Sequence, residues 1–303
     1  MRAFVLSGGG NRGPLQVGAL RVLMERGIMP DLIVGTSTGA INGASLAVSP
    51  TIKQTHEMER LWVRAGKRNL IYVGAATAFM RMVRGKDYIV NNRPLHDDIR
   101  HRVLPPDKQR FGSLKIPLYI TIAHLMSHTL YVYGDDPDAF IADAVVASAA
   151  VPGWFSPTHH HGEVFVDGGV VSALPVEVAL AKGATEIWAL DIASVIDSAI
   201  PPSGVLMYQT YAIRPILYRN SLREAEIAAN TPGVTLHHVP LYDFPNIQLG
   251  DFSKTHDMVE SGIRVMENYL ATPTPNQVQY PPRLPEAKLP AGPRGSKAFI
   301  LKT

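Results

Sequence analysis

The chain alternates between short apolar runs and longer segments in which an apolar residue recurs at every third or fourth position. The first apolar run covers residues 3–6, and after a glycine-rich stretch apolar side chains recur at helical spacing through residues 17–28. A second apolar run, residues 32–34, leads into another stretch of small residues. This pattern predicts two consecutive strand–loop–helix units, which are typical of an α/β domain.

The same pattern predicts further strands and helices as far as residue 270. We expect strands at residues 118–123, 130–133, 164–166, 187–191 and 234–239. We expect helices at residues 49–65, 138–149, 175–181, 205–230 and 254–270. Residues 118–124 and 129–133 should pair as a hairpin, so the predicted fold is a three-layer α/β/α sandwich with a mixed, mainly parallel central sheet. Open sheets of this kind place their sites at the carboxyl ends of the strands.

The loop after the first predicted strand is rich in glycine and reads Ser7-Gly8-Gly9-Gly10-Asn11-Arg12-Gly13. Consecutive glycines can turn several backbone N–H groups toward one point, and the start of the next helix adds positive potential there. The loop therefore suits an anion, either a phosphate or the oxyanion of a tetrahedral intermediate. It also matches the dinucleotide pattern G-x-G-x-x-G, but Asp31 stands at the wrong end of the second strand to hold a ribose.

The loop after the second predicted strand places a serine on a tight strand-to-helix turn, in the sequence Gly35-Thr36-Ser37-Thr38-Gly39. Hydrolases expose a nucleophilic hydroxyl on such a turn, whose neighbours must lack bulk so that a substrate carbonyl can approach. One turn rich in N–H donors beside another that carries Ser37 predicts a single acyl-transfer site.

Ser37 needs a proton acceptor, and histidine is the usual partner. His124, near the end of a predicted strand, is the best candidate for a catalytic histidine, although a hydrogen-bonded residue at a strand end is the favoured interpretation. The run His159-His160-His161 precedes another predicted strand. We interpret it as a hairpin turn rather than as a metal or catalytic site.

Asp167 is the preferred candidate for the base. It closes a predicted strand and is followed by Gly168 and Gly169, where the backbone can approach other groups closely. Taken alone, Asp-Gly-Gly is an ordinary turn sequence. Three loop motifs at strand ends favour the catalytic interpretation.

Together, the three motifs resemble the signatures of patatin-like phospholipases. These are, in order, the glycine loop at residues 8–13, the serine turn at residues 35–39 and the sequence Asp167-Gly168-Gly169. Residues 147–157 resemble the helix and turn that precede the aspartate strand of that family, and weaker similarities lie at residues 88–95 and 250–253. The resemblance extends from about residue 3 to residue 270.

The resemblance implies a Ser–Asp dyad with no histidine between the two residues. Ser37 would be the nucleophile and Asp167 its base, and the backbone N–H groups of Gly8, Gly9 and Gly10 would form the oxyanion hole. The implied supporting residues are Asn11, Arg12, Gly13, Gly35, Gly39, Gly168 and Gly169, and Arg12 would support the loop or attract anionic head groups. The implied reaction is hydrolysis of fatty-acyl esters of (lyso)phospholipids or related lipids through an acyl-enzyme, with no metal or cofactor.

Two alternative functions stay open. An acyltransferase that uses a thioester or lipid acyl donor can share this fold, because an acyl-enzyme does not dictate its acceptor. Such enzymes normally carry a histidine next to the nucleophilic serine, and here Thr36 occupies that position. A non-catalytic nucleotide- or lipid-binding module would leave Ser37 and Asp167 without a role.

Composition indicates a globular protein and gives no sign of a nucleic-acid partner. With 303 residues and 46% hydrophobic content, the chain can bury a full core. We predict one catalytic domain, residues 1–271, and a proline-rich tail, residues 272–303. A net charge of +3 carried by scattered basic residues does not indicate a nucleic-acid partner, and the absence of cysteine excludes disulfides.

The longest apolar segment, residues 70–80, is shorter than the ~20 residues that a membrane span requires. It is flanked by the basic residues Lys67, Arg68, Arg81, Arg84 and Lys86. The segment could contact an anionic bilayer or form a lid, or it could be a helix packed on the sheet. We expect no signal peptide and a cytoplasmic location with peripheral membrane contact, and we leave the oligomeric state open.

Overall fold

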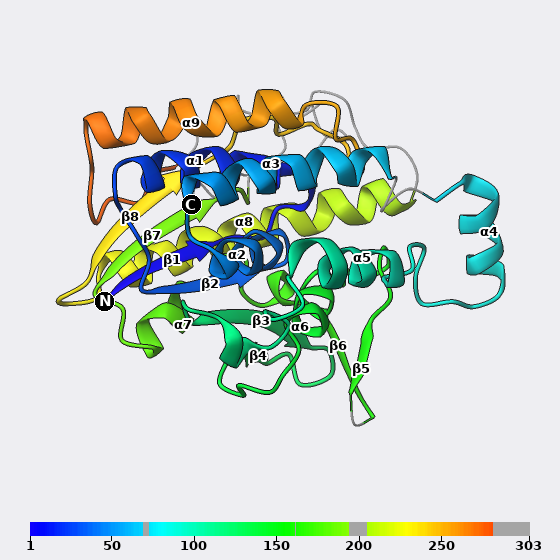
Figure 1. The fold of residues 1–303 in the computed structure, drawn as a ribbon. Coiled ribbons are helices and arrows are strands. Elements are labelled where there is room, and N and C mark those ends of the chain that lie inside the picture. Colours follow the sequence, from blue (N-terminus) through cyan, green and yellow to red (C-terminus); the bar gives the residue numbers. More distant parts are fainter. Residues whose placement is uncertain (69–72, 161, 194–204, 281–303) are drawn as a thin grey trace, which may run out of the picture.

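The computed structural model describes residues 1–68, 73–160, 162–193 and 205–280. Its centre is an eight-stranded sheet with the order β5-β6-β3-β2-β1-β7-β8, and β4 also pairs with β3 (Figure 1). The strands are β1 (Arg2–Leu6), β2 (Leu32–Thr36), β3 (Leu118–His124), β4 (Leu130–Tyr133), β5 (Thr158–His160), β6 (Glu163–Asp167), β7 (Glu186–Asp191) and β8 (Thr235–Pro240). Strands β3, β2, β1, β7 and β8 run parallel, whereas the pairings β3–β4, β3–β6 and β5–β6 are antiparallel.

Helices cover both faces of the sheet (Figure 1). They are α1 (Gly13–Glu25), α2 (Thr38–Val48), α3 (Ile52–Lys67), α4 (Ala75–Val83), α5 (Arg93–Asp98), α6 (Ile141–Ser148), α7 (Val176–Ala181), α8 (Val205–Ala229) and α9 (Thr255–Ala271). Short 3₁₀ turns lie at Gly10–Arg12, Phe111–Ser113 and Gly168–Val170, and a π turn lies at Ile99–Val103.

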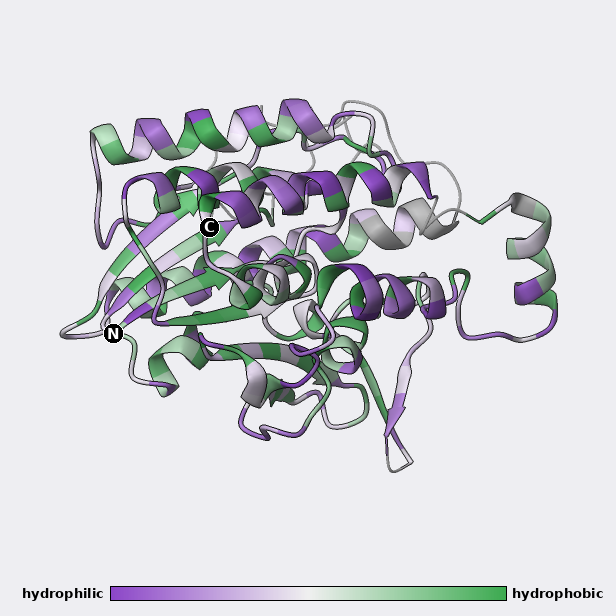
Figure 2. Cartoon of the chain, in the orientation of Figure 1, coloured by the Kyte–Doolittle hydropathy of each residue, from purple (hydrophilic) through white to green (hydrophobic). Residues whose placement is uncertain are grey.

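The alternation of side chains along β1 explains the three layers. Phe4 and Leu6 belong to a core that includes residues of α1, α2, α3 and α9, whereas Ala3 and Val5 belong to a second core with residues of α7 and α8. Because successive strand residues point to opposite faces, one buried strand supplies both cores. Figure 2 shows apolar residues along the central strands and polar ones on the outer sides of α3 and α9. The predicted three-layer sandwich with a mixed sheet is confirmed.

Each predicted strand and helix is present, with ends that differ by at most four residues. The predicted hairpin is confirmed by pairs such as Ile120 with Tyr133. The histidine run is interpreted as a hairpin turn, but in the structure His159 and His160 belong to strand β5 and pair with β6. The turn of the hairpin follows them. His161 lies outside the described residues. The pattern missed α5, which has only six residues and therefore no apolar period to detect.

The apolar segment at residues 70–80 contains a helix in its second half, and residues 69–72 lie outside the described part. Figure 1 places α4 at the side of the molecule, away from the sheet. The interpretation of this segment as a helix packed on the sheet is therefore wrong. No helix among the described residues has the length and apolar character of a membrane span.

The first residues of the predicted tail run beside β8. The Asn276 N–H donates to the Leu236 carbonyl oxygen at 2.8 Å, and the Gln279 N–H donates to His238 Nδ1 at 3.0 Å. Residues 281–303 lie outside the described part, so the domain boundary at residue 271 stays a prediction.

The feature of the sheet that matters most for the site is the shared edge of β3. Thr36, the last residue of β2, pairs with Thr121, and Asp167, the last residue of β6, pairs with Ile122. β4 pairs with the same part of β3, so β2 and β6 must share the other edge. Because β2 runs parallel and β6 antiparallel to β3, their carboxyl ends meet halfway along it.

Candidate active site

Ser37 occupies the turn between β2 and α2 in an unusual backbone conformation. Its φ is 54° and its ψ is −117°, a region that non-glycine residues avoid because of steric strain. The Ser37 N–H donates to the Ser148 hydroxyl at 2.7 Å, and the Ser37 carbonyl oxygen accepts the Ala40 N–H at 2.9 Å. These bonds hold the strained turn, which is the conformation expected of a nucleophile elbow. The sequence analysis missed Ser148, since nothing marks it except its place at a helix end.

The motif glycine Gly39 lets α2 start directly against β1. A Cβ atom on Gly39 would lie 2.0 Å from the Leu6 carbonyl oxygen, a contact that no side chain tolerates. At Gly35, a Cβ atom would lie 2.5 Å from the Gly39 carbonyl oxygen. Gly39 therefore brings the serine turn close to the end of β1, and Gly35 lets the start of α2 lie close to β2.

The glycine loop lies next to this turn, but its three N–H groups are not equivalent. The Gly8 N–H donates to the Ala173 carbonyl oxygen at 2.9 Å. Within the described part of the chain, the N–H groups of Gly9 and Gly10 have no acceptor. Gly10 has a φ of 65°, which glycine adopts without strain. The donors left for a ligand are therefore those of Gly9 and Gly10, and Gly8 has a structural role.

The other residues of this loop fix it to the rest of the fold. The Asn11 side-chain amide donates to the carbonyl oxygens of Gln248 and Asp251 at 2.8 and 2.6 Å. Arg12 is almost fully buried, and its Nε–H donates to the Gly9 carbonyl oxygen at 3.3 Å. Gly13 begins α1, and a Cβ atom there would collide with the Trp62 ring.

Asp167 lies where the shared edge of β3 predicts. It is only 6% exposed, and its Oδ1 accepts the Gly169 N–H at 2.7 Å. Burial raises the pKa of Asp167 to about 6, although hydrogen-bond interactions with the Ser37 side chain and the Gly169 N–H act to lower it. Gly168 packs on β3 so tightly that a Cβ atom would lie 2.4 Å from the Thr121 carbonyl oxygen. The structure thus brings Ser37 and Asp167 together.

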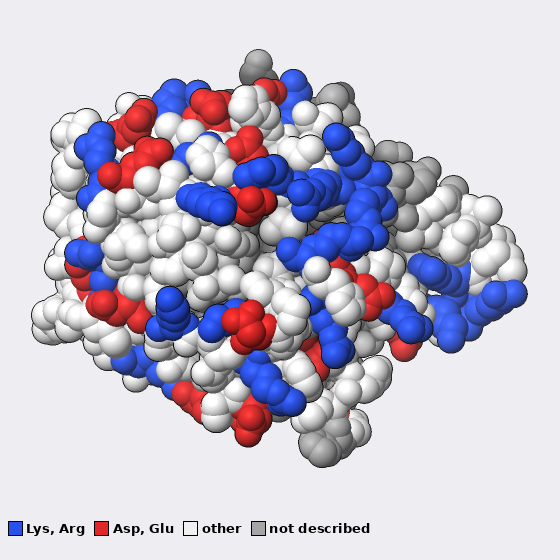
Figure 3. Space-filling view, viewed as in Figure 1, with Lys and Arg blue, Asp and Glu red and all other residues white. Residues whose placement is uncertain are grey.

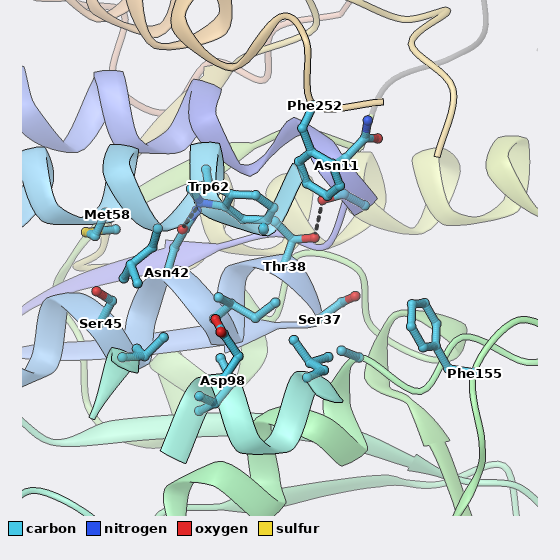
Figure 4. Close-up of a pocket in the computed structure, with 18 of the residues that line it drawn as sticks. Asn11, Ser37, Thr38, Asn42, Ser45, Met58, Trp62, Asp98, Phe155 and Phe252 are labelled. Carbon is cyan, nitrogen blue, oxygen red and sulfur yellow. Dashed lines mark hydrogen bonds between the residues drawn. The ribbon is translucent and has the colours of Figure 1, made fainter. Parts of the chain in front are cut away.

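Two cavities meet at Ser37. The first contains about 880 Å³ of empty space, part of it open to solvent, and has mainly apolar walls. Figure 4 shows Trp62, Phe252 and Phe155 around the space next to Ser37. The second contains about 980 Å³ of empty space, also partly open to solvent, and is lined by Asp167 and the glycine loop. The residues common to both cavities are Gly10, Asn11, Ser37, Val151 and Leu249.

No histidine occurs among the described residues that line the two cavities. His124 lies at the end of β3, where its Nε2 is 2.8 Å from Glu163 Oε2 and its Nδ1 accepts the Ser127 N–H. Its interpretation as a hydrogen-bonded residue at a strand end is confirmed. Among the described residues, no group of three or more histidine, aspartate or glutamate side chains is arranged to hold a metal ion.

Comparison with known families agrees with this geometry. The family model described as patatin-like phospholipase matches residues 4–180, which is more than half of the chain. The chain belongs to the patatin-like phospholipase family. All three motifs, from the glycine loop to Asp167, lie inside the matched region.

Relatives of this patatin-like protein are much longer than the chain itself. It is 29% identical over 195 residues to patatin-like phospholipase domain-containing protein 7 of Mus musculus, a match that covers 63% of this chain and 14% of the relative. It is 24% identical over 274 residues to lysophospholipase NTE1 of Mycosarcoma maydis, with coverages of 84% and 14%. Among solved structures, VipD from Legionella pneumophila is similar, with a TM-score of 0.48, 15% identity, and coverage of 89% of this chain and 67% of that one.

Proposed function

We propose that this patatin-like protein is a serine acyl hydrolase that cleaves fatty-acyl esters of phospholipids or lysophospholipids, with Ser37 as nucleophile and Asp167 as base. The observation that carries the proposal is the interaction of the buried Asp167 carboxylate with the Ser37 side chain. A free aspartate is a weak base toward a serine hydroxyl. Burial raises the pKa of Asp167 to about 6, which brings it closer to the value that a general base needs at neutral pH.

The proposed reaction balances with these two side chains and water. Ser37 Oγ attacks the ester carbonyl carbon while its proton passes to Asp167. The tetrahedral intermediate then breaks the bond to the alcohol oxygen, and Asp167 returns the proton to the leaving alkoxide. Water next attacks the acyl-enzyme and gives a proton to Asp167. The fatty acid leaves, and that proton returns to Ser37 Oγ.

The N–H groups of Gly9 and Gly10 are the proposed oxyanion hole. They line the second cavity next to Ser37 and have no acceptor within the described residues. Fixed N–H donors of this kind stabilise the charge that develops on the carbonyl oxygen. The Gly8 N–H already donates to Ala173, so we leave Gly8 out of this role.

The first cavity is the proposed binding site for the acyl chain. Its walls are mainly apolar and reach Ser37, so an acyl chain inside it would present its ester carbonyl to the nucleophile. The alcohol part of the substrate would then lie in the second cavity, beside Asp167, where the leaving oxygen receives its proton.

Two measurements test the proposal. A fluorophosphonate probe should label the wild type and the remote control Ser113→Ala but not Ser37→Ala. The wild type and Ser113→Ala should also release palmitate from 1-palmitoyl lysophosphatidylcholine, and Ser37→Ala should not. A wild type that takes no label would favour a binding module instead. Transfer of the acyl group to added glycerol, with little free palmitate, would favour the acyltransferase.

We further propose that α4 contacts an anionic lipid surface. Phe79, Met82 and Val83 are each more than 60% exposed, and Arg84 and Lys86 are exposed directly after them. Figure 3 shows more lysine and arginine side chains on the neighbouring surface over α3 and α5. Apolar side chains beside basic ones are typical of segments that bind at the membrane interface.

The inner side of α4 connects this surface to the cavities. Ala78 packs in a small apolar cluster with Val151, Trp154 and Phe155, each of which lines one or both cavities. Arg81, by contrast, donates a hydrogen bond to the Ile89 carbonyl oxygen and therefore holds the segment together. A test should therefore change the exposed basic residues that follow α4.

Charge reversal at Arg84 and Lys86 is the sharper test of lipid contact. The double variant Arg84→Glu/Lys86→Glu should bind vesicles that contain anionic lipid several-fold more weakly, with unchanged hydrolysis of a soluble ester. Reversal of two exposed arginines on other helices or loops, Arg26→Glu/Arg223→Glu, is the matched control. Equal binding by both double variants would contradict the proposal.

A further inference from the structure

The turn that carries Ser37 is joined to the glycine loop by the residue that follows the serine. The Thr38 hydroxyl donates to the Gly10 carbonyl oxygen at 2.5 Å, and Figure 4 shows a dashed line at Thr38, next to Ser37. Thr38 is only 3% exposed. The proposed reaction needs Ser37, Asp167 and N–H donors, so it gives the Thr38 hydroxyl no part.

α2 contacts the glycine loop at a second point, three residues further along the loop. A Cβ atom on Gly13 would lie 2.7 Å from the methyl carbon of Thr38. One helical turn after Thr38, the Asn42 side-chain amide donates to the Gly13 carbonyl oxygen at 3.0 Å. Residues four apart share one face of a helix. One face of α2 therefore holds both ends of the segment 10–13.

The bonds made by the carbonyl groups of this loop set the direction of its N–H groups. A glycine backbone has wide conformational freedom, and the C=O and N–H of one trans peptide point in opposite directions. The Arg12 Nε–H donates to the Gly9 carbonyl oxygen, so the Gly10 N–H in the same peptide points to the other side. The Thr38 hydroxyl holds the next carbonyl, that of Gly10. A side-chain donor thus fixes each of the two peptide groups that flank the Gly10 Cα atom.

The bond between Thr38 and Gly10 also links the two reacting parts of the site. Ser37 follows β2 and the glycine loop follows β1, so the nucleophile and the proposed oxyanion donors belong to different strand–helix units. An oxyanion donor is effective only when it lies about 3 Å from the developing charge. Thr38 is adjacent to the nucleophile, and Gly10 carries one of the donors. The bond between them fixes their spacing before a substrate arrives.

We propose that Thr38 is a positioning residue, whose hydroxyl holds the Gly10 carbonyl so that the Gly10 N–H stays aligned with the oxyanion that forms at Ser37. This inference rests on the proposed function and adds a residue that acts through the glycine loop. The bond joins two parts of the protein, and its effect is greatest where the oxyanion forms. Its loss should therefore slow the chemical step and leave substrate binding unchanged.

The first test separates kcat from KM. Thr38→Val removes the hydroxyl, keeps a side chain of similar volume and so preserves the wall of the first cavity. We expect kcat on p-nitrophenyl butyrate to fall about tenfold with an unchanged KM, a smaller loss than the ~10²-fold that follows removal of an oxyanion donor. Thr38→Ser keeps the hydroxyl and should restore most of kcat. A higher KM with unchanged kcat would show that Thr38 contacts the substrate and would overturn the inference.

The second test asks whether the loss concerns the oxyanion. It uses the thionoester of the same substrate, in which sulfur, a weaker hydrogen-bond acceptor, replaces the carbonyl oxygen. Thr38→Val should lower the kcat/KM ratio of the ester to the thionoester several-fold, because only the oxygen compound gains fully from an aligned Gly10 N–H. Thr38→Ala removes the hydroxyl by a different substitution and should lower the ratio to the same extent. An equal loss on both substrates would overturn the inference.

Thr231→Val is the matched control. The Thr231 hydroxyl also donates to a main-chain carbonyl oxygen, that of Ile227 at 2.7 Å, but it lies just before β8, at the opposite end of the sheet from the site. This variant should keep the wild-type kcat and the wild-type ratio. Wild-type kinetics in Thr38→Val would overturn the inference and leave the hydrolase proposal standing. Wild-type hydrolysis by Ser37→Ala would instead overturn the proposed function.

Discussion

The two cavities that meet at Ser37 differ in whether the polar groups that line them have hydrogen-bond partners. In the first, polar side chains are paired with one another. The Trp62 indole N–H donates to Asn42 Oδ1 at 2.9 Å, and the Asp98 carboxylate accepts from Arg68 at 2.5 Å and Arg102 at 2.8 Å. What remains toward the cavity is an apolar wall.

The second cavity has polar groups that its neighbours do not fully satisfy. Burial raises the pKa of Asp167. The N–H groups of Gly9 and Gly10 have no acceptor within the described residues. An apolar wall binds a substrate and its transition state equally, whereas preorganised charges and donors stabilise only the state that carries charge. Under the proposed function, the first cavity would contribute mainly affinity and the second mainly the chemistry.

Asp167→Asn should have the largest effect, because it removes the base from the second cavity and keeps the shape. We expect kcat/KM on a soluble ester to fall by about 10³- to 10⁴-fold. His124→Ala is the control and should keep wild-type activity. Near-normal hydrolysis by Asp167→Asn, with activity abolished in His124→Ala, would show that the base is wrongly assigned.

The same substitution should stabilise the fold at neutral pH. The folded-state pKa of Asp167, about 6, lies above the unfolded value of 3.8, so the folded state loses stability as the pH rises between these values. Above about pH 6 the buried charge costs up to ~3 kcal/mol. Asp167→Asn should therefore raise the melting temperature at pH 8 and raise it much less at pH 4. A lower melting temperature at pH 8 would argue against a desolvated carboxylate.

The pH profile should be the next largest effect. Because Asp167 must be deprotonated to act as a base, kcat/KM for a soluble ester should fall about tenfold per pH unit below roughly pH 6. The rate of fluorophosphonate labelling should follow the same curve. A profile that stays flat to pH 4 would mean that the Asp167 carboxylate is well solvated and that its pKa is not raised. The second cavity would then not differ from the first in this respect.

Filling the first cavity should have a smaller effect that depends on chain length. Ala65 lines this cavity, and Ala65→Phe should lower kcat/KM for a palmitoyl ester about tenfold more than for a butyryl ester. Each methylene that can no longer be buried costs ~0.8 kcal/mol. Val63→Phe, on the exposed side of the same helix, is the control. An equal loss of kcat/KM on both esters would show that the first cavity does not bind the acyl chain.

Ser148→Ala should have the smallest effect. It leaves the buried Ser37 N–H without its acceptor, which should cost about 1–3 kcal/mol of stability in thermal or urea unfolding. Activity on esters of either length should fall only a few-fold, because the serine turn is loosened and neither cavity is altered. A loss as large as that of Asp167→Asn would indicate a direct part in catalysis.

Much of the fold could be predicted from sequence because strands and helices leave local apolar patterns. The hairpin of β3 and β4 and the helices α7, α8 and α9 follow from runs and spacing alone. The elements that escaped prediction, α5 and β5, are too short to establish a period. The apolar segment around α4 has a helical pattern, but that pattern cannot distinguish packing on the sheet from exposure.

At the site, the sequence by itself determined which groups are present: a serine at a strand end, a run of glycines and an aspartate before two glycines. Tertiary structure decided which of them meet. Ser37 and Asp167 come together because β2 and β6 share one edge of β3, a pairing that no local pattern records. In the same way, contacts between distant segments engage the Gly8 N–H, place Ser148 beneath the elbow and bring Arg214 to the cavity of Arg12. Local patterns reflect the next few residues, whereas burial, pKa shifts and hydrogen-bond partners depend on groups that only folding brings close.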